Sequence, residues 1–124
     1  MNKPLLILIS GPYMSGTNGD EAAIAANLRR MEDFSLAIYN KGHLAVVGEW
    51  FAWPVIRQAG GTSHSSPEFK EFQYPVAHRL LSKCDAVLRI PGESRGADLE
   101  CEKARELGLT IFTDIDQIPT VEIV

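Results

Sequence analysis

Short apolar runs alternate with helical segments along the whole chain, and this alternation restricts the fold more than any other feature of the sequence. The first run, residues 5–9, is Leu-Leu-Ile-Leu-Ile, which is apolar on both faces, as a central parallel strand is. Strands that alternate with helices predict a parallel sheet with right-handed crossovers and helices on both faces. We therefore expect an α/β protein.

The other expected strands are also short, and glycine or polar loops bound them. They cover residues 43–47, 85–90 and 109–112, and residues 121–124 are a candidate for a short edge strand. Apolar residues at helical spacing indicate helices over residues 21–41, 68–83 and 96–108. Pro75 marks a kink or a break in the second of these helices.

Residues 48–67 form the longest segment without a clear period. A loop of this length in a small domain is usually functional or mobile, although part of it can be helical. It carries Trp50 and Trp53, which we expect to be core or interface anchors rather than residues that stack on a ligand.

Composition excludes several classes of function. The 124 residues fit a single domain over residues 1–124, and the net charge of −4 argues against nucleic acid or an anionic membrane surface as the main partner. The apolar start is too short for a signal peptide or a membrane span. Cys84 and Cys101 match no metal-ligand spacing and form a poor disulfide framework, so we expect a cytoplasmic protein. The three histidines are scattered, and we expect two of them at the surface or an interface.

Two polar loops should meet at one crevice. In a flavodoxin-like or Rossmann-like three-layer sandwich, with four or five parallel strands in the order 2-1-3-4(-5), the first and third strands are neighbours at the topological switch point. The loops that follow them, residues 10–20 and 91–96, are rich in glycine, serine and other polar residues. Their convergence predicts a small-molecule site.

Each loop has two interpretations. Residues 11–17 have the glycine spacing and the threonine of a phosphate-binding P-loop but lack its lysine, so NTPase chemistry is disfavoured and a steric role for the glycines stays open. Ser94, Gly96 and the following helix start form an anion-binding nest with Arg95 at hand, or else a capped turn with an exposed arginine.

Glu100 is a carboxylate on the apolar side of its helix. It shares a stripe with Ala97, Ala104 and Leu107, whereas the other charged residues of the helix lie on other faces. A carboxyl group that faces the sheet from the helix of a strand–loop–helix unit is in a position suited to catalysis. The alternative is a structural glutamate that accepts hydrogen bonds from backbone amides at the helix start.

Three segments together carry a resemblance to a known family. They are Ile9-Ser10-Gly11-Pro12-Tyr13 after the first strand, Cys84-Asp85-Ala86-Val87 at the start of the third, and Pro91-Gly92-Glu93-Ser94-Arg95-Gly96-Ala97-Asp98-Leu99-Glu100. The chain resembles the nucleoside 2-deoxyribosyltransferase superfamily. Within it, the likeness is greatest to a group of small bacterial and phage proteins that form a domain of unknown function.

The resemblance implies an N-glycosidase or 2-deoxyribosyl transferase that acts on a nucleoside or nucleoside 5′-monophosphate, without a metal or other cofactor. Glu100 matches the glutamate that attacks the anomeric carbon in characterised relatives, and Tyr13 matches the tyrosine beside it. Ser94 and Gly96 match the phosphate-holding loop. Substrate-binding residues are expected in both loops: Gly11, Pro12, Met14, Ser94, Gly96, Ala97 and Asp98. Relatives often complete their site from a second subunit, so a homodimer or larger homo-oligomer is expected.

One position departs from the family pattern. Relatives commonly carry an aspartate seven residues before the position of Cys84, where this chain has Ala77, followed by His78. Neighbouring helical residues point about 100° apart, so His78 is a poor substitute. The departure leaves open two alternatives to an enzyme: a catalytically silent nucleotide-binding or regulatory protein of the same fold, and a structural oligomer with a vestigial crevice.

Overall fold

The sheet has the strand order that the sequence predicts. The computed structural model describes residues 3–122, in which four parallel strands pair in the order β2-β1-β3-β4. They are β1 (Leu6–Ser10), β2 (Leu44–Val46), β3 (Ala86–Arg89) and β4 (Thr110–Phe112). Of the candidate edge strand, Val121 only donates its N–H to the Lys41 carbonyl at 2.8 Å, and residues 123 and 124 lie outside the described residues.

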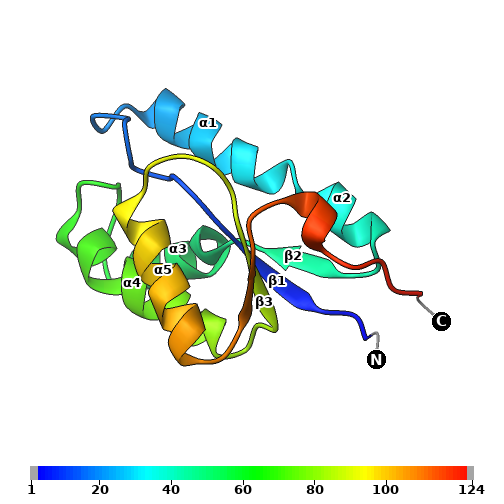
Figure 1. Ribbon diagram of the computed structural model, residues 1–124. Coiled ribbons are helices and arrows are strands. Elements are labelled where there is room, and N and C mark those ends of the chain that lie inside the picture. Colours follow the sequence, from blue (N-terminus) through cyan, green and yellow to red (C-terminus); the bar gives the residue numbers. More distant parts are fainter. Residues whose placement is uncertain (1–2, 123–124) are drawn as a thin grey trace.

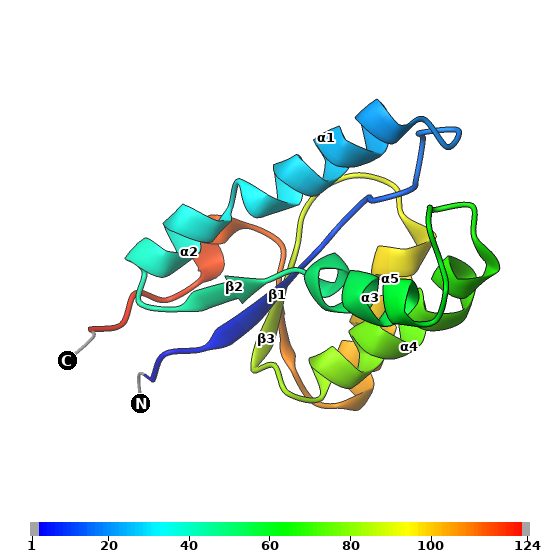
Figure 2. The same ribbon diagram turned by 180° about the vertical axis from the view of Figure 1, so that it is seen from behind.

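Helices cover both faces of the sheet (Figures 1 and 2). On one side lie α1 (Glu21–Glu32), α2 (Ser35–Asn40) and the short 3₁₀ helix η1 (Ile115–Gln117). On the other side, α5 (Arg95–Glu106) packs on β3 and β4, and α4 (Pro67–Leu81) packs between α5 and α3 (Gly48–Gln58). This is the expected three-layer α/β sandwich.

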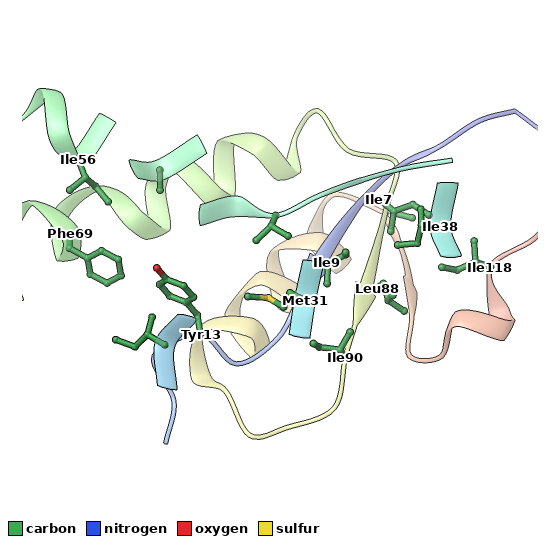
Figure 3. Packing of buried hydrophobic residues seen from close by; sticks show 14 residues of the cluster. Ile7, Ile9, Tyr13, Met31, Ile38, Ile56, Phe69, Leu88, Ile90 and Ile118 are labelled. Carbon is green, nitrogen blue, oxygen red and sulfur yellow. The ribbon is translucent and has the colours of Figure 1, made fainter. Parts of the chain in front are cut away.

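Alternation along β1 divides the core into two clusters. Ile7 and Ile9 pack with Met31 and Ile38 from the α1 and α2 layer. Leu8, on the opposite face, joins a cluster built with α4 and α5 residues: Leu80, Leu81, Cys101 and Ala104. Figure 3 shows the first cluster, with Tyr13 and Phe69 at one end and Ile38 and Ile118 at the other. Burial on both faces explains why β1 is apolar from Leu6 to Ile9.

The single helix expected over residues 21–41 is wrong. The chain forms α1 and α2, because the helix is interrupted at Asp33 and Phe34. Met31 and Ile38, on either side of this interruption, are both in the core.

Two prolines lie inside helices that continue past them. Pro54 lies within α3, and Pro75 does not divide α4. Residues 48–58 form α3, although the sequence predicts the start of an irregular stretch there. The two helices pack against each other and bury Ala52 and Ala77, among other residues. This packing offsets the loss of about 3 kcal/mol that an interior proline costs an isolated helix.

The two tryptophans have different surroundings. Trp53 packs against the core residue Phe69, with ring centroids 5.5 Å apart. Trp50 is 40% exposed and donates its indole N–H to Glu32 at 2.8 Å.

Leu107, which we expected on the buried stripe of its helix, is exposed, because it caps the end of α5. Among residues 3–122, no helix has the length and apolarity to cross a bilayer.

Candidate active site

The loops after β1 and β3 touch each other, as the switch-point rule predicts. Ser10 and Arg89 are paired in register at the ends of these strands. A Cβ on Gly11 would lie 2.4 Å from Cγ1 of Ile90, and one on Gly92, whose φ is +121°, would lie 2.6 Å from Cγ of Pro12. Both glycines therefore permit the close approach of the two loops.

Hydrogen bonds from α1 and within the loop hold the first loop in shape. The buried side-chain amide of Asn27 donates to the carbonyl of Tyr13 at 2.8 Å. The hydroxyl of Thr17, the residue in the P-loop-like position, donates to the carbonyl of Met14 at 2.6 Å. Thr17 thus stabilises its own loop, in agreement with the steric interpretation of this segment.

A small cleft opens beside these loops and the first turns of α3 and α5. Seven of the nine residues predicted from the sequence line it: Gly11, Tyr13, Met14, Ser94, Gly96, Ala97 and Glu100. Four further residues that the sequence did not single out complete the lining: Ser15, Glu49, Gln73 and Tyr74.

Two predicted binding residues do not line this cleft. Pro12 faces Gly92, and Asp98 is an exposed ion-pair partner of Arg89 at 3.1 Å. Arg95 was also expected near an anion, but it lies in a separate surface hollow with Glu93 and Asp98. The physical reason is the helical turn: residues 95 and 98 lie on the solvent side of α5, whereas 97 and 100 face inward.

Glu100 lies in the wall of the cleft and contacts the end of β1. Its Oε1 accepts a hydrogen bond of 2.5 Å from the hydroxyl of Ser10, rather than from an amide at the start of α5. Burial raises the pKa of the Glu100 carboxyl to about 7, and the charge of Glu49 adds to this rise. The Ser10 hydrogen bond and the Arg89 guanidinium lower the pKa, because both favour the ionised form. Glu100 can therefore change protonation state near neutral pH.

The start of α5 is capped by its own serine. The Oγ of Ser94 accepts a hydrogen bond of 3.1 Å from the Ala97 amide, so that amide is not an unpaired donor. The first intrahelical donor is Asp98, which donates to the Ser94 carbonyl at 3.0 Å. The amides of Arg95 and Gly96 precede it and have no intrahelical partner. Of the donors expected to bind an anion at this helix start, the backbone amides of Arg95 and Gly96 and the hydroxyl of Ser94 remain.

Tyr13 belongs to a hydrogen-bonded chain that ends at the surface. Its hydroxyl lies 2.6 Å from Nε2 of His64 and accepts the indole N–H of Trp53 at 3.2 Å. Nδ1 of His64 lies 3.1 Å from a carboxylate oxygen of Glu21. His64 is therefore a partly buried partner of Tyr13, not a surface residue. Burial raises the pKa of the Tyr13 hydroxyl, so it stays protonated near neutral pH.

Glu49 is the principal residue that sequence reasoning missed. It is only 8% exposed, lines the cleft beside Glu100, and accepts a hydrogen bond of 3.4 Å from the side-chain amide of Gln73. Burial raises the pKa of its carboxyl. The sequence contained a signal for this residue. Glu49 follows the last residue of β2 by three positions, and the carboxyl ends of parallel strands meet at one edge of the sheet.

Ala77, which replaces the expected aspartate, lies behind this pair of acids. It is buried, and its Cβ would lie 3.3 Å from a Cβ added to Gly48. The same added Cβ would be 4.0 Å from Oε2 of Glu100. Position 77, where the resemblance leads us to expect an aspartate, therefore carries only a methyl group next to Gly48.

Among the described residues, no group of three or more histidine, cysteine or acidic side chains could hold a metal ion.

Comparison with known proteins finds a likeness in structure and none in sequence. No protein-family model matches the chain, and no curated protein matches its sequence. A solved 2-deoxyribosyltransferase from the psychrotolerant bacterium Bacillus psychrosaccharolyticus has a similar structure, with a TM-score of 0.58 at 15% identity over 86% of this chain and 69% of that chain. At this identity the likeness shows the fold: the chain has the α/β fold of a 2-deoxyribosyltransferase.

Proposed function

We propose that this protein cleaves the N-glycosidic bond of a nucleoside or nucleoside 5′-monophosphate, with Glu100 as the nucleophile. One observation carries the proposal: a partly buried carboxylate, held by the Ser10 hydroxyl, lines a cleft at the switch point of the sheet. The fold of the chain, which is that of a nucleoside-processing enzyme, supports the same chemistry.

The reaction needs little besides a well-positioned carboxylate. The C1′–N bond breaks, its electron pair leaves with the base, and positive charge develops on the sugar ring. An ionised Glu100 about 3 Å from C1′ stabilises that charge and forms an ester with C1′. Water then hydrolyses the ester, or a second base accepts the sugar; these outcomes define hydrolysis and transfer. Tyr13 supports the site as a lining residue whose hydroxyl is held by His64 and Trp53.

The charges around the cleft favour an uncharged nucleoside over a monophosphate. Its lining, within the part of the chain that the structure describes, contains two carboxyl groups and no lysine or arginine. A 5′-phosphate would depend on the neutral donors at Ser94 and Gly96. The nucleoside is therefore the first substrate class to test, and the monophosphate is the second.

A silent nucleotide-binding protein is the rival function, and Ala77 is the observation that favours it. If the aspartate at that position is indispensable, the cleft binds a nucleoside without turning it over. Binding and turnover must therefore be measured together.

The test is a screen of ribo- and 2′-deoxyribonucleosides and their 5′-monophosphates for released free base, read by chromatography, with and without an acceptor base. Thermal-shift binding is measured on the same compounds. We expect release from at least one nucleoside by the wild-type protein and none by Glu100→Gln. Binding without release from any compound would support the silent rival and refute the enzyme.

We also propose a homo-oligomer in the cytoplasm. Phe51 and Val55 of α3 and Tyr74 of α4 are exposed large apolar side chains, and Tyr74 also lines the cleft. Light scattering coupled to size exclusion measures the mass directly, and a monomer at micromolar concentration contradicts the proposal.

A further inference from the structure

We propose that Glu49 is a second catalytic carboxyl group, which protonates the departing base and afterwards takes a proton from the attacking water. This inference rests on the proposed N-glycosidic cleavage and extends it. Glu49 on α3 would transfer the proton, because the methyl group of Ala77 on α4 cannot.

The position of Glu49 follows from a close contact between two small residues. Gly48 and Ala77 are near enough that a Cβ on Gly48 would lie 3.3 Å from the Ala77 Cβ. This contact allows the first turn of α3 to start against α4 and next to Glu100. Glu49, the second residue of α3, thereby reaches the cleft that Glu100 also lines. The small side chain at position 77 and the acid at position 49 are thus parts of one arrangement.

The surroundings of Glu49 suit a carboxyl group that holds a proton. It is buried, and the hydrogen bond that it accepts from the side-chain amide of Gln73 is long at 3.4 Å. Glu100, in contrast, accepts a short hydrogen bond from Ser10 and feels the positive charge of Arg89. Two carboxyl groups in one cleft disfavour a doubly ionised state, so the single proton resides preferentially on Glu49.

The charged and titratable groups that act on Glu49 come from every neighbouring element. Glu100 on α5 and Tyr13 in the first loop share its cleft, and His64, between α3 and α4, exerts a charge effect on it. Burial is the largest effect and raises the pKa of Glu49, whereas the hydrogen bond from its own backbone N–H, the Gln73 hydrogen bond and the charge of His64 lower it. The apparent pKa values of activity belong to the Glu49–Glu100 pair rather than to either residue alone.

The proton balance of the two steps is complete. In the first step, C1′–N breaks, the Glu49 proton moves to the leaving nitrogen, and Glu100 forms the C1′–O ester. In the second step, the ionised Glu49 takes a proton from water, the water oxygen bonds to C1′, and the ester bond to Glu100 breaks. Both carboxyl groups return to their starting states, and no oxidant, metal or further reactant is required.

Leaving groups of different basicity test this assignment. A purine or pyrimidine base departs readily only when it is protonated, whereas 4-nitrophenolate departs without a proton. With Glu49→Gln, we expect the rate of base release from the best nucleoside substrate to fall about 100-fold or more. The first-turnover release of 4-nitrophenolate from 4-nitrophenyl 2-deoxyribofuranoside, read as a burst, should slow less than about fivefold, because the bond-breaking step of this substrate does not need general acid catalysis. Glu100→Gln should lose both activities.

Two controls separate the proton-transfer role from a structural one. Glutamine has the shape of a protonated glutamate, so the melting temperature of Glu49→Gln should remain close to that of the wild type. Glu71→Gln, which changes an exposed acid on α4, should leave both rates unchanged. The alkaline limb of the pH–rate profile on the nucleoside should also disappear in Glu49→Gln.

The outcomes distinguish this inference from the function on which it rests. Equal losses on both substrates, or no loss on either, would overturn the acid–base role of Glu49 while leaving the cleavage reaction in place. If the wild-type protein releases base from no nucleoside or nucleotide, the proposed function fails and this role fails with it.

Discussion

The hydroxyl of Ser10, the last residue of β1, donates a hydrogen bond of 2.5 Å to Oε1 of Glu100 on α5. The two residues are 90 positions apart in the sequence, and the sheet brings them together because β1 and β3 are neighbours. The contact orients one carboxylate oxygen, Oε1. It also favours the ionised form of Glu100.

Replacing Glu100 by Gln tests the nucleophile directly. The amide keeps the shape of the side chain but cannot attack C1′, so we expect the rate of base release to fall by about 10³-fold or more. A 2-fluoro sugar nucleoside should form an adduct on Glu100 of the wild type, detectable by mass spectrometry. Glu102→Gln, on the exposed face of the same helix, is the control. Wild-type release by Glu100→Gln contradicts the assignment.

Replacing Ser10 by Ala should shift the pH dependence of the reaction. The variant loses the hydrogen bond that lowers the pKa of Glu100, so this pKa should rise further above about 7. The acid limb of kcat/KM should move to higher pH, and the loss of rate should be larger at pH 6 than at pH 8. Ser82→Ala, at the far end of α4, should have the wild-type profile. An equal loss at both pH values means that Ser10 acts only structurally.

The stability of the protein should decrease as the pH rises. The folded-state pKa of Glu100, about 7, lies above its usual value of 4.5, so the folded state binds more protons between these values. The free energy of unfolding therefore falls as the pH increases through this range, by about 2–3 kcal/mol between pH 5 and pH 8. Urea titrations measure this slope. Glu100→Gln should reduce this slope, while the raised pKa of Glu49 maintains the remainder; an unchanged slope in that variant contradicts the raised pKa of Glu100.

Replacing Tyr13 by Phe should have a smaller effect than loss of Glu100. It removes the hydroxyl that contacts His64 and Trp53, at a cost of about 1–3 kcal/mol in transition-state stabilisation. We expect a roughly 10- to 100-fold loss in kcat/KM with the fold retained. Tyr39→Phe, an exposed tyrosine, is the matched control. A Tyr13→Phe protein with wild-type kinetics leaves the ring as a packing residue only.

Restoring the family acid at position 77 should depend on Glu49. Ala77→Asp alone adds a third carboxyl group beside Gly48 and Glu100, and we expect the free energy of unfolding to fall by about 3 kcal/mol with no gain in rate. In Glu49→Gln, the same change should recover part of the lost activity on the nucleoside. A double variant that is no faster than Glu49→Gln shows that the two positions do not share a role.

The local sequence determined the type of most elements and the order of the strands. The run Leu-Leu-Ile-Leu-Ile at residues 5–9 is apolar at every position, which only a strand buried on both faces requires. Once strands and helices alternate, crossover handedness leaves few topologies, and the switch-point rule indicates where the loops meet. Glu100, Tyr13 and the Ser94 loop could therefore be assigned to one crevice before the structure was known.

Only the tertiary structure decided where the helices end and which side chains share the cleft. The break at Asp33 and Phe34 and the persistence of α4 through Pro75 depend on packing against other elements, which outweighs local propensity. The same is true of the site. Glu49 reaches Glu100 because Gly48 and Ala77 allow α3 to approach α4, and His64 reaches Tyr13 from 51 residues away. Such contacts depend on distances across the fold, and a local pattern of residues does not contain them.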